Sequence, residues 1–227
     1  MDLNIDLGEL PDEPEELYAL AHVANIACGG HAGDSVSVAE AVRRCKAHGT
    51  RVGAHPSYPD RASFGRTAMA MAPDALRTSV REQCLLLAIA ARALDVQVTS
   101  LKAHGALYHA APGDPIVARA TLEGAVDALG TGITVLGPDG GALATVAREA
   151  GLAYAREGFA DRGTRADGTL VPRGEPGALI IDPSEAASVA RRLAASGRYE
   201  TLCVHGDTPG AVAIARAVRK TLEAVTP

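Results

Sequence analysis

Asp2-Leu3-Asn4-Ile5-Asp6-Leu7-Gly8-Glu9 alternates apolar and polar residues and then ends in a glycine and an acid. Alternation with a period of two is typical of a half-buried β-strand. Five later segments also pass from a short apolar run into polar residues and glycine, and they lie at 25–34, 53–61, 101–105, 157–162 and 204–207. Parallel α/β folds keep their chemistry at the carboxyl ends of strands, so these endings predict one site built from many strands.

Seven short strand candidates alternate with helical segments along the 227 residues. The strands are predicted at Leu3–Leu7, Val23–Ala27, Val52–Ala54, Ser100–Ala103, Ile133–Leu136, Leu152–Arg156 and Thr201–Val204. The helical segments combine amphipathic spacing with recognisable ends, such as the cap at Asp34 and the terminating Gly49. They are predicted at 15–21, 34–49, 73–94, 114–130, 142–150, 182–197 and from 208 onward.

Regular alternation of strands and helices indicates parallel βα units. Seven units with polar endings on nearly every strand favour a closed (β/α)7 barrel of the TIM type. An open sheet would instead concentrate its ligand site at one switch point. No linker or repeat interrupts residues 1–227, so we expect one domain. The long irregular stretch at 159–180, with a turn signal at Asp167-Gly168, is expected to serve the site.

Composition excludes several classes of protein. The net charge of -5 comes without a basic stripe, which argues against nucleic-acid binding, and no apolar run approaches the ~20 residues of a membrane span. The sequence has no signal-peptide pattern and its four cysteines form no C-x-x-C pair, so we expect reduced thiols and a cytoplasmic location. Phosphate-binding loops of the G-x-x-x-x-G-K-[ST] and G-x-G-x-x-G types are absent, so this chain has no recognisable ATP site of its own.

Polar side chains near the strand ends are the candidate catalytic residues. Strand periodicity places Asn4 with Asp6 on one face, and Lys102 with His104 on one face, which in a barrel would be the interior. Lysine is rarely buried without a partner. His104 and His205 each precede a glycine, which lets a ligand approach the backbone. Histidine, lysine and a carboxylate in a partly dry pocket suit general acid/base catalysis.

Structural roles and metal binding are the alternatives for these residues. Asp6 could cap a turn, His31 and His55 could be turn residues, and Asp161-Arg162 could be a surface ion pair of little energetic worth. Cys28 is interpreted as a small buried hydrophobe rather than a nucleophile. Metal ligands could come from separate strand ends, namely Asp6, His31, His55, His104 and His205. No H-E-x-x-H or H-x-x-x-H pair is present, so a metal is left open.

Seven collinear stretches resemble the LamB/YcsF family, whose members are also called the A subunits of 5-oxoprolinase. They are 2–9, 25–34, 53–66, 101–108, 159–162, 167–173 and 203–207. The resemblance implies a (β/α)7 barrel similar to the deacetylase and glycosidase group. It also implies a part in the ATP-dependent opening of 5-oxoproline (pyroglutamate) to L-glutamate, with ATP used together with partner subunits B and C.

The resemblance also carries over nine site residues by motif match. Asp6, Lys102, His104 and His205 are the expected catalytic residues, and the expected substrate-binding residues are His31, His55, Asp161, Arg162 and Asp207. Three positions depart from the family, since Gly30, Ala103 and Thr164 stand where Phe, Pro and Tyr are usual. Two alternative functions remain open, a stand-alone metal-dependent deacetylase or amidohydrolase and a non-catalytic lactam-binding subunit.

Overall fold

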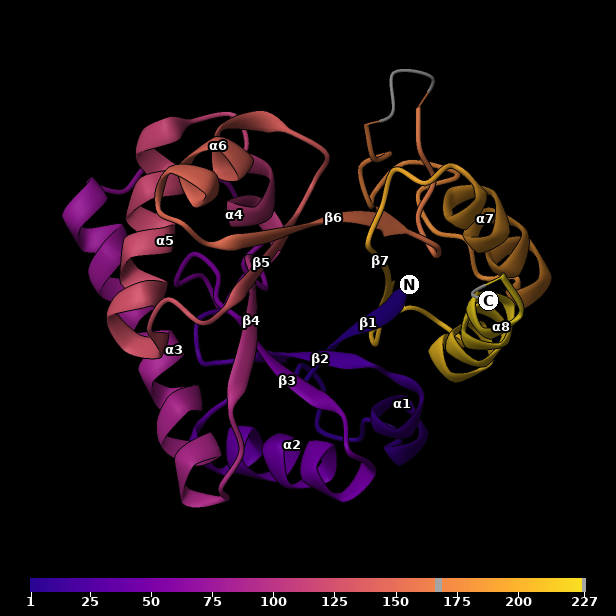
Figure 1. Cartoon of the computed structure of the whole chain (residues 1–227), viewed down its shortest axis with the longest axis horizontal. Helices are drawn as coiled ribbons and strands as arrows, with labels where there is room; N and C mark the ends of the chain where they lie inside the picture. Colours follow the sequence, from indigo (N-terminus) through magenta and orange to yellow (C-terminus); the bar gives the residue numbers. More distant parts are fainter. Residues whose placement is uncertain (166–168, 226–227) are drawn as a thin grey trace.

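Seven parallel strands close into a barrel in chain order, with helices packed around the outside (Figure 1). The computed structural model describes residues 1–165 and 169–225, and the predicted turn at Asp167-Gly168 lies outside them. The strands are β1 Asp2–Leu7, β2 Val23–Ala27, β3 Arg51–His55, β4 Val98–Lys102, β5 Thr134–Gly137, β6 Ala153–Phe159 and β7 Thr201–His205. The predicted (β/α)7 barrel of the TIM type is therefore confirmed.

The helices connect successive strands and begin largely where the caps predict. They are α1 Glu15–Leu20, α2 Ser35–His48, α3 Pro73–Ala93, α4 Gly105–Ala110, α5 Pro115–Leu129, α6 Gly141–Glu149, α7 Pro183–Ala195 and α8 Ala211–Val225. The side chains of Asp34, Asp114 and Asp182 accept backbone N–H groups at the starts of α2, α5 and α7. Helix α4 has no counterpart in the predicted elements, because it is short, follows the polar ending of β4 directly, and has neither a side-chain cap nor an acidic residue in its first turn.

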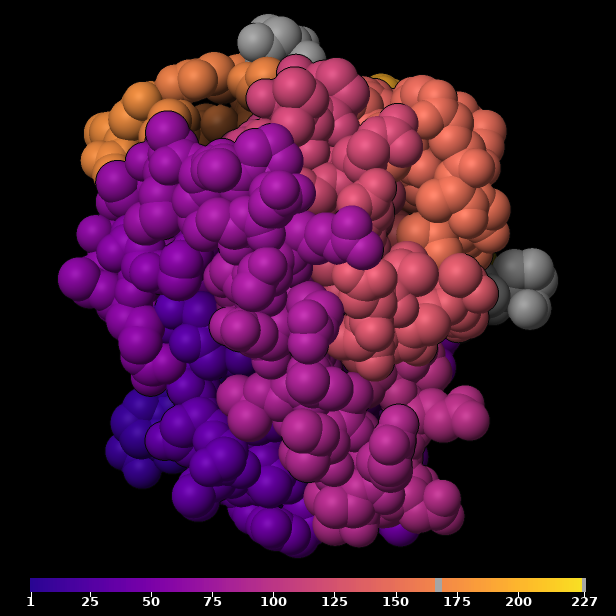
Figure 2. All heavy atoms as spheres, turned by 90° about the vertical axis from the view of Figure 1, so that its left-hand side faces the viewer, coloured from indigo at the N-terminus to yellow at the C-terminus, as the bar shows by residue number. Residues whose placement is uncertain are grey.

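The apolar faces of the helices cover the outside of the barrel. Helices α3 and α5 lie on the left-hand side of the barrel in Figure 1, and Figure 2 shows the molecule from that side. Gly124 lets these two helices approach closely, because a Cβ there would lie 2.4 Å from the carbonyl oxygen of Arg77. The four cysteines are free and buried. No helix of the described residues is long and apolar enough to cross a membrane.

Polar side chains fill much of the barrel interior. Asn4 donates to Thr201 Oγ1 at 2.9 Å, and Asn25 donates to Asn4 Oδ1 at 2.8 Å. The small size of Gly53 makes room for this layer, because a Cβ there would meet Ser100 Oγ at 2.4 Å. These hydrogen bonds offset part of the cost of burying the polar groups and fix the side chains that make them.

Strand β6 is longer than predicted. The prediction ended at Arg156 because Glu157-Gly158 interrupts the apolar pattern, but the strand continues to Phe159. Glu157 lies opposite Thr201 in the register with β7 and is buried. A buried acid can interrupt the apolar pattern of this strand because Lys102 in the barrel interior pairs with Glu157.

Strands β1 and β7 lie side by side and close the barrel (Figure 1). Their parallel register pairs Asp6 with His205, and β1 also pairs Asp6 with Asn25 of β2. The residue at the carboxyl end of the last strand therefore lies beside a residue near the end of the first. This closure brings polar groups from distant parts of the sequence to one end of the barrel.

Candidate active site

A cavity of about 440 Å³ lies at the carboxyl ends of the strands. Its walls include six of the nine predicted site residues, which are Asp6, His55, Lys102, His104, Arg162 and His205. The other three, His31, Asp161 and Asp207, do not line the cavity, but each contacts a residue that does. This volume falls within the range of small-molecule sites.

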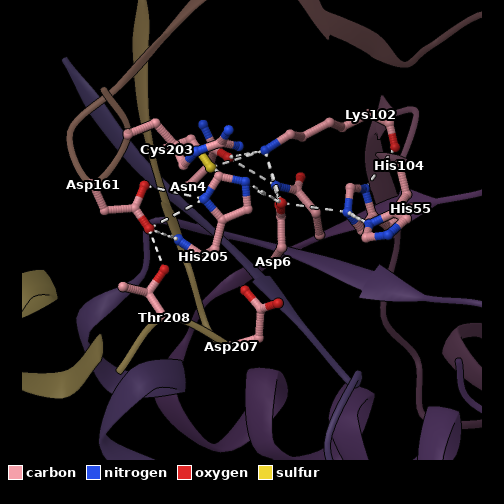
Figure 3. Close-up of polar contacts among 12 residues, drawn as sticks. Asn4, Asp6, His55, Lys102, His104, Asp161, Cys203, His205, Asp207 and Thr208 are labelled. Atoms are coloured by element: carbon pink, nitrogen blue, oxygen red, sulfur yellow. Dashed lines mark hydrogen bonds and ion pairs between the residues drawn. The ribbon is translucent and has the colours of Figure 1, made fainter. Parts of the chain in front are cut away.

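Asp6 and Lys102 form the buried centre of the cavity floor. Lys102 Nζ lies 2.9 Å from Asp6 Oδ1 and 3.1 Å from Asp6 Oδ2, and Asn25 donates to Asp6 Oδ1 at 2.8 Å (Figure 3). Burial alone would raise the pKa of Asp6, but His55 and Lys102 outweigh it and hold this pKa well below its usual range. Asp6 is thus a carboxylate that is already occupied by donors.

Lys102 has two further buried partners that the sequence did not single out. Glu157 Oε1 lies 2.9 Å from Lys102 Nζ, and Cys203 Sγ lies 3.0 Å from it. Burial alone would lower the pKa of Lys102, but Asp6, Cys203 and Glu157 hold it well above its usual range. Lys102 therefore stays a cation and can stabilise negative charge, but it cannot serve as a base.

His205 is held by Asp161 in a fixed orientation (Figure 3). Its backbone N–H donates to Asp161 Oδ2 at 2.9 Å, and its ring Nδ1 lies 3.0 Å from Asp161 Oδ1. Thr208 donates to Asp161 Oδ2 at 2.7 Å. Burial would raise the pKa of Asp161, but His205 and Thr208 lower it, so a carboxylate accepts these bonds. With the hydrogen on Nδ1, the His205 Nε2 lone pair is free, 3.8 Å from Asp6 Oδ2.

A second histidine cluster lies on another part of the wall. His55 Nε2 is 3.0 Å from His104 Nδ1, and the His31 and His104 rings stack at 3.6 Å. Glu9 Oε1 lies 3.1 Å from His31 Nε2 and 3.2 Å from His104 Nδ1. Among the nine predicted residues Glu9 is missing, although the polar run of the first strand ends on it. Its burial beside three histidines follows from the turn at Gly8, whose φ is 72°.

The pKa values of the side chains in this cluster shift in different directions. Burial lowers the pKa of His31 to about 4 and also lowers that of His104. Burial would lower the pKa of His55 as well, but Asp6 outweighs it and the pKa is raised. Burial would raise the pKa of Glu9, but the neighbouring His104 and His31 rings lower it. A carboxylate thus faces two rings that are neutral at ordinary pH.

Two groups of side chains in the described residues have ligand atoms close enough to share a metal ion. The first is Glu9, His31, His55 and His104, and the second is Asp6, Cys203 and His205. Within each group the candidate ligand atoms lie within 4.8 Å of one another.

The long connection after β6 forms the outer wall of the cavity. Arg162 Nε donates to the Ala178 carbonyl at 3.0 Å and Arg162 Nη2 to the Val171 carbonyl at 2.6 Å, which folds the segment back on itself. Burial and Arg173 lower the pKa of Arg162. Arg173 lies 3.2 Å from Asp207 Oδ1, and Arg66 pairs with the same carboxylate. Three guanidinium groups therefore face the cavity, and anions are its natural ligands.

The three departures noted in the sequence also lie near this end of the barrel. A Cβ on Gly30 would lie 2.2 Å from Gln83 Oε1 and 2.4 Å from Ser57 Oγ, so Gln83 fills the space above this glycine. Gln83 is anchored to Ser57, donating to its carbonyl at 2.9 Å and accepting from its N–H at 3.0 Å. Ala103 lines the cavity, and Thr164 bridges Leu170 in the long connection.

Comparison with known sequences identifies close similarity along the whole chain. The model of the LamB/YcsF family matches residues 1–226. A protein of Methylococcus capsulatus, named as the A subunit of 5-oxoprolinase, is 44% identical, with 99% of this chain and 92% of that protein covered. A protein of Chloroflexus aggregans with the same name is 43% identical, with 99% and 95% covered.

Solved structures agree with the barrel. The lactam utilization protein from Thermus thermophilus superposes with a TM-score of 0.89 at 38% identity, and the match covers 99% of this chain and 96% of that one. A family 4 carbohydrate esterase from Streptomyces lividans has a TM-score of 0.53 at 11% identity, covering 99% of this chain and 88% of that one. At that identity the likeness extends to the fold alone.

Proposed function

The chain belongs to the LamB/YcsF family, and from that premise we propose that it is the lactam-opening subunit of an ATP-dependent 5-oxoprolinase. It converts 5-oxoproline to L-glutamate together with partner subunits, the B and C subunits of such an enzyme. The names of its relatives support this assignment.

The observation that carries the proposal is the placement of an oriented base and several cations around a single cavity. His205 Nε2 is the base, because Asp161 holds Nδ1–H and leaves the other lone pair free. Lys102 is the cation on the cavity floor, and Arg162 and Arg173 line the outer wall. A small cyclic amide with one carboxylate matches this arrangement of charge.

Ring opening adds the oxygen of water to the lactam carbonyl carbon and breaks the bond from that carbon to the ring nitrogen. His205 Nε2 takes a proton from the attacking water and returns it to the departing nitrogen. The Lys102 ammonium stabilises the negative charge at the lactam oxygen, which carries a phosphoryl group in the activated substrate described next. Arg162 or Arg173 holds the carboxylate of 5-oxoproline, which fixes the ring relative to the base. Asp6 keeps Lys102 in place instead of acting as the base, since its oxygens are already occupied.

ATP enters through the partner subunits in this proposal. An unstrained five-membered lactam is a poor electrophile, and transfer of a phosphoryl group to its oxygen would make the carbon reactive toward water. Opening the phosphorylated ring leaves an acyl phosphate, and a second water cleaves it to the glutamate carboxylate and free phosphate. The chain carries no glycine-rich phosphate loop of either familiar type, so the phosphoryl transfer is assigned to the partners.

The test compares the chain alone with the chain plus its partner subunits, each given ATP, Mg²⁺ and 5-oxoproline. We expect coupled release of glutamate and ADP from the assembled system, and none above background from the single chain. Sustained, coupled release by the chain alone would contradict the division of labour. His205→Asn should stop glutamate release by the assembled system while the variant still binds its partners in a pull-down.

Two other functions predict different results in the same assay. A stand-alone deacetylase or amidohydrolase would hydrolyse N-acetyl substrates without ATP or partners. A non-catalytic lactam-binding subunit would bind 5-oxoproline and leave the assembled system fully active after His205→Asn. If His205→Asn stops ATP-dependent glutamate release but still binds the partner subunits, the result supports the proposal over both alternatives.

A further inference from the structure

His55 and His104 turn two bare nitrogen lone pairs toward each other. His55 Nε2 and His104 Nδ1 are 3.0 Å apart. The second nitrogen of each ring is already used, since His55 Nδ1 lies 2.8 Å from the Lys102 carbonyl oxygen and His104 Nε2 lies 3.0 Å from that of Phe64. A carbonyl oxygen can only accept, so those two nitrogens carry the hydrogens. When both rings are neutral, His55 Nε2 and His104 Nδ1 therefore carry no hydrogen.

A carboxylate enters the same buried space. Glu9 Oε1 lies 3.2 Å from His104 Nδ1 and 3.7 Å from His55 Nε2. Within the described part of the chain, Glu9 has no lysine or arginine at ion-pair distance, and its ion-pair contacts are with histidines alone. Three electron-pair donors that converge in a buried space repel one another, and a cation between them would relieve that repulsion.

His31 orients the carboxylate and is not a fourth ligand. Its Nε2 lies 3.1 Å from Glu9 Oε1, and its buried Nδ1 has no hydrogen-bond partner among the described residues. A hydrogen on Nδ1 would be buried and unsatisfied, so it belongs on Nε2, where Glu9 accepts it. His31 then has no lone pair to offer toward the shared space. Three ligands remain, and His55 and His104 line the cavity, so a fourth position faces the cavity.

The other candidate group already holds a cation. Asp6, Cys203 and His205 also have ligand atoms within sharing distance. The Lys102 ammonium, however, lies 2.9 Å from Asp6 Oδ1 and 3.0 Å from Cys203 Sγ. A metal ion there would have to displace a lysine that is itself buried between carboxylates.

We propose that Glu9, His55 and His104 bind one divalent transition-metal ion of the zinc type in the cavity wall, with His31 as a positioning residue. Two imidazole nitrogens, one carboxylate oxygen and an open position are the donor set of one class of catalytic zinc sites. Metal-binding histidines usually donate their second N–H to a carbonyl or carboxylate, as both rings do here. The inference concerns binding alone and does not depend on the proposed lactam reaction.

The experiment measures metal binding by the full chain. Protein stripped with a chelator and desalted is titrated with Zn²⁺ in competition with a chromophoric chelator. A parallel titration with Co²⁺ follows the visible absorption that four- and five-coordinate cobalt acquires. We expect one equivalent of either ion to bind saturably and the cobalt spectrum to develop to the same endpoint.

Matched variants locate the ion. His104→Ala and Glu9→Gln should lose saturable binding, whereas His31→Ala should still bind one equivalent with affinity about ten- to a hundredfold weaker, as for outer-shell partners. His205→Ala, in the second group, should keep the wild-type affinity. Circular dichroism identifies the folded variants, and Glu9→Gln, which preserves side-chain shape, decides the case if His104→Ala does not fold.

Two outcomes would overturn the proposal. Folded wild-type protein that shows no saturable one-to-one binding of Zn²⁺ or Co²⁺ would mean that the shared cation is a proton between the two rings. Binding that survives His104→Ala and Glu9→Gln but is lost in His205→Ala would place the ion in the second group.

Discussion

Asp161 accepts hydrogen bonds from both the backbone N–H and the ring Nδ1–H of His205, so one buried carboxylate fixes the main chain and the side chain of the same residue. The ring therefore cannot rotate without breaking the contact that also anchors the end of β7. A histidine held in this way presents one defined nitrogen to the cavity, which is what a general base requires.

We expect Asp161→Asn to lower the rate of glutamate release in the assembled system by about a hundredfold or more. An amide cannot accept from the His205 backbone, the His205 ring and Thr208 with the same strength, so the tautomer and orientation of the ring are no longer fixed. Steady-state rates measured across a range of pH test this, because a positioning role should also change the pH profile. Thr208→Val removes only the third contact and should keep most of the activity. An unchanged rate and pH profile in Asp161→Asn would contradict the role of the pair.

Lys102→Met should remove activity and also destabilise the fold. The substitution leaves Asp6 and Glu157 buried without their cation, and breaking a buried ion pair in this way costs about 3–5 kcal/mol. Urea denaturation of the single chain measures the loss. Adding Glu157→Gln to Lys102→Met should recover part of the stability but none of the activity. Equal stability of the single and double variants would show that Glu157 is not an energetic partner of Lys102.

Gly30→Ala should destabilise the protein by about 1–3 kcal/mol, as overpacking does. The new Cβ would collide with Gln83 Oε1 and Ser57 Oγ, and Gln83 cannot move without losing its two hydrogen bonds to Ser57. Gly132→Ala is the matched control, since a Cβ there meets nothing within 4 Å. The free energy of unfolding should be non-additive when Gly30→Ala is combined with Gln83→Ala, because the second change opens the space that the first needs. Full additivity would mean that the two positions do not share that space.

His22 should make the fold less stable in mild acid. Its Nδ1 accepts the Leu3 N–H at 2.8 Å, and burial together with Arg219 lowers the pKa of His22 below its usual 6.5. The folded state then binds fewer protons than the unfolded chain, so the free energy of unfolding falls as the pH drops through 6.5 toward the folded pKa. His22→Asn keeps an acceptor for Leu3 but does not titrate. Wild type should lose more stability than His22→Asn between about pH 7.5 and 5.5, a window that brackets histidine titration. Parallel losses would rule out His22 as a source of the dependence.

The barrel could be predicted because its signals are local. Strand periodicity, aspartate caps and terminating glycines each involve residues close in sequence, and they place β1, α2 and α7 within a few residues of their bounds. Helix α4 and the end of β6 could not be found in this way. Helix α4 is short and has no side-chain cap, and the end of β6 contains a charge whose burial depends on Lys102 of another strand.

The members of the site could be predicted only in part, because their roles depend on neighbours from other strands. Lys102 and His104 stand out in the sequence, but nothing local shows that Glu9 lies against His31 or that Glu157 balances a lysine. Arg66 and Arg173 lie within stretches that resemble the family, yet only the folded barrel brings these two loops to Asp207. A closed barrel brings residues that are far apart in sequence into contact, and their spacing in the sequence does not show which of them will be neighbours.

Pairing of β1 with β7 has a consequence for how the protein is made. Asp6 is synthesised early and His205 late, yet they lie opposite each other in the register that closes the barrel. Until β7 has been synthesised, β1 lacks its partner strand on that side and Asp161 has no His205 to orient. The cavity can therefore be completed only after β7 pairs with β1, and contacts between segments so far apart in sequence form slowly. An edge strand that stays open until β7 is in place can pair with other chains, so closure of the barrel also protects the protein from aggregation.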